Sequence, residues 1–153
     1  MKTIHCLLKT NDSATPLLAR LALGLVMFPH GAQKVLGWFG GYGFDGTMGF
    51  FTGTLHIPAA LAFLAILAEF AGSLGLITGC LSRLSALGIA ATMSVAIFMA
   101  HSGNGFFMNW NGNQKGEGYE YHLLAIGLAL VVLVAGGGKA SIDGLLARNA
   151  NAT

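Results

Sequence analysis

Long apolar stretches alternate with shorter polar or glycine-rich segments along this chain, and the stretches define its predicted architecture. Four of them reach or approach the length of a bilayer-crossing helix, at residues 17–37, 57–81, 84–101 and 121–136. A helix rises about 1.5 Å per residue and a bilayer core is about 30 Å thick, so about 20 apolar residues span it. The pattern predicts an all-α membrane protein, an antiparallel bundle of four transmembrane helices forming a single integral membrane domain over residues 1–153.

The composition supports a membrane location. Of the 153 residues, 54% are hydrophobic and only 9% are charged, a balance that soluble domains do not have. The lipid bilayer is therefore the first predicted partner. The net charge of +2 comes without a basic patch that carries interleaved aromatics, which argues against nucleic-acid binding.

Lysine and arginine positions predict the orientation, because short cytoplasmic loops are enriched in these residues. With four spans, both termini and the turn at residues 82–83 lie on one side. That side carries six basic residues against two on the other, Lys34 and Lys115. The six are Lys2, Lys9, Arg20, Arg83, Lys139 and Arg148. We expect cytoplasmic termini and a multi-pass protein of the cytoplasmic (inner) membrane.

The two longer connections, residues 38–56 and 102–120, then face outward. Both are rich in glycine and aromatic residues. Such aromatics usually belong to the interfacial belt of a membrane protein, and this is the favoured interpretation. Each connection is nevertheless longer than helix connections in bundles usually are, so a lid over a site stays open as the alternative.

Glu69 is the most informative single residue, because it lies in the middle of the apolar stretch 57–81. An ionisable group at the centre of a transmembrane helix costs about 2.5 to 3.5 kcal/mol on insertion scales, so it usually faces a protein interior or a wet cavity and marks a functional site. Small residues share its helix face, whereas bulky apolar residues occupy the opposite face. We therefore expect Glu69 to face protein.

Other polar residues fall in the outer half of the predicted bundle. His101 and His122 lie near its mouth and Lys34 a turn inside, with His30 about 10 Å and Glu69 about 18 Å below the outer end by helical rise. His30, Gln33 and Lys34 share one helix face. Each histidine taken alone is more often structural than functional, but their joint occurrence with a carboxylate predicts a site.

The candidate roles divide by chemistry. Glu69 and His30 are the candidates for moving protons, and the binding candidates are Arg20, Gln33, Lys34, His101 and His122. A metal requires ligands at one depth, which His30, His101 and His122 reach only if the helices tilt, so these three are weak metal candidates. A purely structural pair, Glu69 with Arg20 or with Lys34, is the remaining alternative.

Several short motifs follow one another along the first 83 residues. They are Arg20 to Gly24, Phe28-Pro29-His30-Gly31 followed by Lys34, Gly43-Phe44, Phe50-Phe51, Ile57-Pro58, Glu69-Phe70-Ala71-Gly72, Gly79 and Arg83. With them the chain, from about residue 14 to 146, resembles the DoxX family of small four-helix bacterial membrane proteins. The resemblance implies association with membrane redox or sulfur-handling complexes, since some relatives are subunits of thiosulfate:quinone oxidoreductases. It implies no agreed catalytic residues.

Three functions follow as hypotheses. The first is a redox-linked membrane subunit whose outer-half cavity holds a quinone or a small sulfur compound, with electrons supplied by a redox or sulfur-metabolism partner protein. The second is a binding or transport module for a metabolite or metal without redox chemistry. The third is an assembly partner whose polar residues only join helices. Any intrinsic catalysis and the oligomeric state, including a homo-oligomer, are left open.

Overall fold

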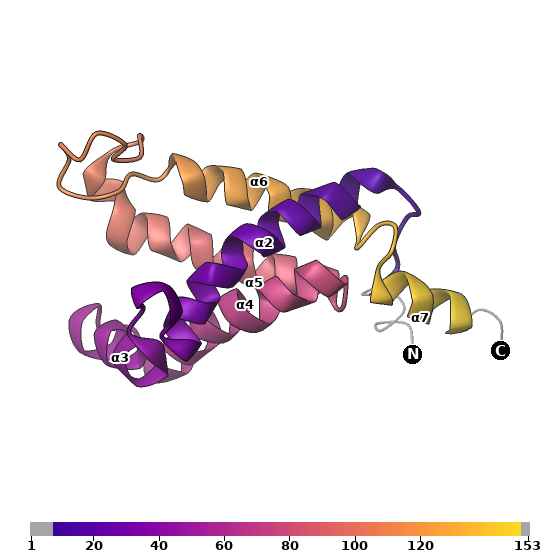
Figure 1. Ribbon diagram of the computed structural model, residues 1–153, viewed down its shortest axis with the longest axis horizontal. Coiled ribbons are helices and arrows are strands. Elements are labelled where there is room, and N and C mark those ends of the chain that lie inside the picture. Colours follow the sequence, from indigo (N-terminus) through magenta and orange to yellow (C-terminus); the bar gives the residue numbers. More distant parts are fainter. Residues whose placement is uncertain (1–7, 151–153) are drawn as a thin grey trace.

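Helices account for all the regular structure in residues 8–150, which are the residues that the computed structural model describes (Figure 1). The α-helices are α2 (Ala14–Leu36), α3 (Gly43–Gly49), α4 (Ala59–Thr78), α5 (Ser82–Ala96), α6 (Glu120–Ala135) and α7 (Ile142–Ala150). Short helical segments extend or connect them: η1 (Trp38–Gly40), η2 (Phe50–Thr54), η3 (Ile97–His101) and η4 (Ser102–Asn104). The predicted all-α class is confirmed over these residues.

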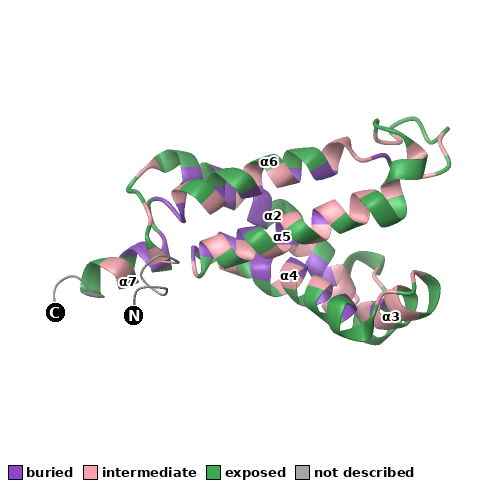
Figure 2. Ribbon diagram, turned by 180° about the vertical axis from the view of Figure 1, so that it is seen from behind, coloured by how far each residue is buried: buried purple, intermediate pink, exposed green. Residues whose placement is uncertain are grey.

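Four helices pack side by side. Helix α2 contacts α4 and α6, and α5 contacts the same two helices. The side chains buried between them are mainly small and aliphatic, and Figure 2 shows the outward sides of α5 and α6 largely exposed. The core consists of Ala19, Leu23, Met27, Leu76, Ala86, Ile89, Met93, Ala125, Ala129 and Val132.

A helix occupies most of each of the four apolar ranges, with ends that differ from the predicted ones by a few residues. Helix α2 begins earlier than expected: its N-cap is Ser13, whose hydroxyl accepts a hydrogen bond from the Thr15 amide at 3.2 Å. A serine hydroxyl two residues before a free amide is a standard N-cap. Helix α2 then continues through Pro29 to Leu36, where Gly37 adopts φ 71° and ends it.

Length and hydropathy single out two helical stretches of residues 8–150 that suffice to cross a membrane, 59–78 and 82–104. Helix α6 is equally apolar along its length but shorter, with 16 residues. The second stretch combines α5 with η3 and η4 in one continuous helical segment of 23 residues.

Two elements were not expected. The connection after α2 is not a plain loop, because it contains α3 and the π-helix η2. At the other end, α7 follows the glycine turn 136–138, and the Ser141 hydroxyl accepts a hydrogen bond from the Gly144 amide at 3.1 Å at its start. Leu145 and Leu146 are exposed on this helix. Figure 1 shows α7 at the end of the molecule opposite α3.

Candidate functional site

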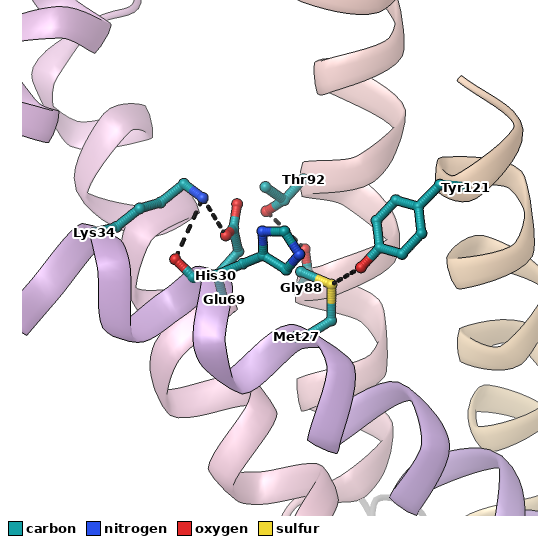
Figure 3. Close-up of polar contacts among 7 residues, drawn as sticks. All are labelled: Met27, His30, Lys34, Glu69, Gly88, Thr92 and Tyr121. Carbon is teal, nitrogen blue, oxygen red and sulfur yellow. Dashed lines mark hydrogen bonds and ion pairs between the residues drawn. The ribbon is translucent and has the colours of Figure 1, made fainter. Parts of the chain in front are cut away.

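The centre of the site is an ion pair between α2 and α4. Lys34 Nζ lies 2.6 Å from Glu69 Oε2, with Lys34 contributing a partly exposed side chain and Glu69 a buried one (Figure 3). Lys34 Nζ also makes a long contact of 3.5 Å with the His30 carbonyl oxygen. The prediction that Glu69 faces protein is confirmed. The predicted separation in depth of Lys34 and His30 from Glu69 is wrong, because counting helical rise from assumed helix ends missed the crossing of α2 and α4, which places Gly31 against the backbone of Glu69 and Phe70.

A glycine brings the two helices close enough for this pair. A Cβ atom placed on Gly31 would lie 2.6 Å from Phe70 Cα and 2.8 Å from the Glu69 carbonyl carbon. Real Cβ atoms do not approach backbone so closely, so only glycine permits this crossing. The motif that predicted the site, His30-Gly31 followed by Lys34, thus supplies both the contact point and the cation one turn away.

His30 and Tyr121 line the same space from α2 and α6. Their ring centroids are 6.0 Å apart, and Figure 3 shows the His30 ring between the Lys34–Glu69 pair and the Tyr121 ring. The Tyr121 hydroxyl donates a hydrogen bond to the sulfur of Met27 at 3.3 Å. Because a thioether is a weak acceptor, this hydroxyl remains available to a stronger partner.

His101 and His122 form a second cluster, close to the connection 102–120 that was predicted to face outward. Their ring centroids are 4.2 Å apart. His101 Nδ1 lies 2.8 Å from the Glu117 carbonyl oxygen, and a carbonyl only accepts, so Nδ1 is the donor of this hydrogen bond and Nε2 is not used in it. His122 is 6% exposed and its Nδ1 has no hydrogen-bond partner among the described residues. The pair therefore has unused hydrogen-bonding capacity on both rings.

These groups border one cavity of about 760 Å³. Its polar lining comes chiefly from His30, Lys34, Glu69, Thr92, His101, Glu117, Tyr121 and His122. The rest of the lining is mostly apolar and includes Met27, Phe50, Phe51, Leu61, Leu64, Ala65, Ala68, Val95, Met99 and Met108. A large apolar cavity with a few convergent polar groups is the usual form of a small-molecule site.

Arg20 lies apart from this cavity. Its guanidinium is buried and makes five hydrogen bonds to backbone carbonyls, those of Leu76, Ile77, Gly137, Lys139 and Ala140, at 2.7 to 3.2 Å. The alternative Glu69–Arg20 pair is therefore replaced by Glu69–Lys34. Arginine has five N–H donors, so Arg20 is saturated by the main chain.

Two further candidates behave differently from the sequence expectation. Gln33 turns away from the cavity and its Nε2 donates to the Phe39 carbonyl at 3.3 Å, which ties α2 to η1. The weak metal candidates His30, His101 and His122 all line the cavity. Among residues 8–150, however, no group of three or more His, Cys, Asp or Glu side chains is placed to hold a metal ion.

Sequence reasoning missed Tyr121, Thr92, Glu117 and the methionines of the cavity. Tyr121 directly precedes His122, and this adjacency was a usable signal. Thr92 donates its hydroxyl to the Gly88 carbonyl at 3.0 Å, an intrahelical bond that makes a threonine in an apolar helix unremarkable (Figure 3). The methionines are indistinguishable from core residues in a sequence of this hydropathy.

Apolar helices joined by an ion pair between α2 and α4 are consistent with a helical membrane protein. The chain belongs to the DoxX family, whose sequence profile matches residues 15–102, more than half of the chain. No curated protein and no solved structure matches the chain. The profile match includes Lys34, Glu69 and His101, whereas Tyr121 and His122 lie beyond it.

Proposed function

We propose that this protein is a membrane subunit of an oxidoreductase and that its outer-half cavity binds the headgroup of a quinone. The observation that carries the proposal is the Lys34–Glu69 ion pair, which borders a cavity of about 760 Å³ with otherwise mostly apolar walls. A quinone headgroup matches this combination, because its flat ring is apolar and its two carbonyl oxygens accept hydrogen bonds. A small sulfur compound is the alternative ligand, attracted by the Lys34 ammonium.

The chemistry assigned to the site is proton supply. Reduction of a quinone takes two electrons and two protons and converts both carbonyl oxygens to hydroxyls. The electrons come from a redox centre of a partner protein. The Lys34 ammonium donates a hydrogen bond to one carbonyl oxygen, and Glu69 and His30 pass protons to the ring oxygens.

The histidine pair supplies these protons from outside. His101 Nε2 is free to accept a proton, and the His122 ring lies next to it at a centroid distance of 4.2 Å. The rings of His122 and Tyr121 are 5.6 Å apart, and those of Tyr121 and His30 are 6.0 Å apart. With a water or the ligand bridging these steps, the row leads from the outer loop toward Glu69.

We further propose that the four packed helices α2, α4, α5 and α6 all span the cytoplasmic membrane, with both termini inside. Single cysteines in a cysteine-free background test this orientation. Cysteine at the exposed positions Tyr42 and Asn113 should react with an impermeant maleimide in intact cells, whereas Asn149→Cys should not. Reaction at Asn149 in intact cells would reverse the assigned orientation.

Direct binding tests the ligand. The purified protein in lipid nanodiscs is titrated with a short-chain ubiquinone and binding is followed by tryptophan fluorescence. Lys34→Met and Glu69→Gln should each weaken binding at least tenfold. Lys115→Met removes an exposed lysine of the outer loop that does not line the cavity, so it should bind as the wild type does. Unchanged affinity in the Lys34 and Glu69 variants would remove the cavity as the binding site.

The third hypothesis, an assembly partner, is favoured by one observation, since the Lys34–Glu69 pair also joins α2 to α4. If the pair only joins helices, the two variants lose stability while the wild type binds neither quinone nor sulfur oxyanion. Thermal unfolding measured beside the titration separates these cases.

A further inference from the structure

Helices α4 and α5 touch at their inner halves and separate toward the outer end. A Cβ atom on Gly88 of α5 would lie 3.0 Å from the Ala68 Cβ of α4, and one on Gly72 would lie 3.5 Å from the Ser85 carbonyl oxygen. Gly88 and Ala68 line the cavity, whereas Gly72 and Ser85 do not. The cavity therefore begins where the small-residue contact ends, and Figure 1 shows the two ribbons diverging from there toward α3 and the outer loop.

The walls of this gap are apolar and open. Four exposed apolar side chains line the cavity: Leu61 and Leu64 of α4, Val95 at the end of α5, and Met99 of η3. They are 45 to 56% exposed. A side chain that lines a cavity and is also exposed stands at the cavity's opening. Leu67 of α4 and Leu87 of α5 are similarly exposed, at 44% and 54%, but do not line the cavity, so they are ordinary outward-facing residues.

We propose that this gap is a lateral entrance for a ligand dissolved in the bilayer. The polar headgroup lies at the Lys34–Glu69 pair, and an attached isoprenoid chain lies between α4 and α5, against Leu61, Leu64, Val95 and Met99. This inference rests on the proposed quinone site and selects tailed quinones over water-soluble ligands.

The size of the cavity supports a tailed occupant. A small sulfur oxyanion fills only a small part of a cavity of about 760 Å³ and leaves most of the apolar lining without a contact from the ligand, whereas covering apolar surface is favourable. An isoprenoid chain covers those walls and passes through the gap between α4 and α5 into the lipid.

The order of groups along the cavity matches such a ligand. The ion pair lies on the α2 side, where α2 and α4 pack together, and the exposed apolar side chains lie on the α4–α5 side. Outside the cavity no charged side chain of residues 57–78 or 84–101 borders the gap. A polar molecule in water therefore has no favourable contact along this route, and a chain in lipid has a continuous one.

The test compares one quinone ring with and without its tail. Wild-type protein in nanodiscs is titrated with 2,3-dimethoxy-5-methyl-1,4-benzoquinone and with the same ring carrying two isoprene units, and affinities are expressed per ligand concentration in the lipid. We expect the tailed quinone to bind at least tenfold more tightly after this correction. A tail-independent affinity would overturn the lateral entrance while leaving the headgroup site in place. If neither quinone binds, the proposed function fails and the entrance fails with it.

Variants locate the tail. Leu64→Trp and Val95→Trp fill the gap from exposed positions, where a larger side chain does not disturb the core. Each should reduce the affinity of the tailed quinone to that of the bare ring and leave the bare ring unaffected. The matched controls are Leu67→Trp and Leu87→Trp, on the same helices but outside the cavity. Equal losses in the controls, or unchanged tail preference in both gap variants, would contradict the inference. A tailed quinone with a photoactivatable group at the end of its chain gives a readout independent of affinity, since it should label peptides of residues 57–78 and 84–101.

Discussion

Two cations of this protein, the buried Arg20 and the partly exposed Lys34, lie on the same helix and differ in their partners. Arg20 has five carbonyl partners and no free donor among the described residues, whereas Lys34 has one short contact to Glu69 and one long contact to a carbonyl. The Glu69 carboxylate, which accepts up to about four hydrogen bonds, has a single partner in the part of the chain described. The comparison teaches that saturation, rather than charge or burial, separates a structural ion from one that is available to a ligand.

Removing Arg20 should have the largest effect on stability. Arg20→Leu leaves several buried carbonyls without donors, and each buried acceptor left unsatisfied costs about 1 to 3 kcal/mol. We expect a strongly lowered midpoint of thermal unfolding in detergent and poor extraction from membranes. Arg148→Leu, which changes an exposed arginine, is the control. If Arg20→Leu is as stable as the wild type, the carbonyls bind water instead, and Arg20 is not a structural ion.

Removing the Asp143 carboxylate should cost less. Its two oxygens accept hydrogen bonds from the amides of Leu81 and Ser82 at 2.7 and 2.8 Å, at the start of α5. Loss of such a cap costs about 0.5 to 2 kcal/mol. Asp143→Ala should lower the unfolding midpoint detectably, and Asp143→Asn should lower it less, since the amide oxygen still accepts one bond. Asp12→Ala, at an exposed position, provides the baseline.

Breaking the Lys34–Glu69 pair should affect stability by only about 1 kcal/mol, because Lys34 is 23% exposed and its ammonium can turn to the cavity. Glu69→Gln should fold almost normally, and Glu69→Ala should be less stable because it leaves a void. The exchange Lys34→Glu with Glu69→Lys restores opposite charges and should recover stability without recovering quinone affinity. If Glu69→Gln unfolds as readily as Glu69→Ala, the pair is structural and the assembly hypothesis gains.

The histidines should show the smallest stability effects and the clearest functional ones. His30→Ala, His101→Ala and His122→Ala should each leave the helices assembled. Proton-coupled turnover of the complex, normalised to protein level, should fall in all three, and most in His122→Ala because its ring is between His101 and Tyr121. The exposed His56 borders the cavity without contacting these rings, so His56→Ala serves as the comparison. Full activity per molecule in all three variants would exclude proton transfer along His101, His122 and His30.

The positions of the helices and the importance of Glu69 were predictable from sequence, but the contrast between Arg20 and Lys34 was not. The apolar stretches located the helices, and the carboxylate within an apolar stretch pointed to the candidate site, because both signals depend on local chemistry. Whether Glu69 would pair with Arg20 or Lys34 depends on which helix faces approach, and that is decided by Gly31 against the backbone of Phe70 and Glu69. A contact between two backbones does not change the pattern of hydrophobic and polar residues, so the sequence does not predict it.

Helix α7 and the turn before it show a different limit. Their apolar residues are too few to predict a span, and their importance lies in main-chain groups: carbonyls for Arg20, and a short helix that places the Asp143 carboxylate. Main-chain acceptors are present at every residue, so no sequence pattern marks the ones that a distant arginine will use. A cavity was predicted from the polar residues, but its apolar lining and its opening between α4 and α5 were not, because the divergence of α4 and α5 depends on two helices together.

The partners of Arg20 also impose an order on biogenesis. Arg20 is synthesised early, yet three of its five acceptors, the carbonyls of Gly137, Lys139 and Ala140, belong to the end of the chain. Until the ribosome has released that segment, the guanidinium has no complete set of acceptors in the nascent protein and must stay in contact with lipid headgroups or water. Helix α2 therefore gains the complete set of hydrogen bonds to Arg20 only after residue 140 has been made, and a chain that stops short of residue 137 lacks three of the five acceptors.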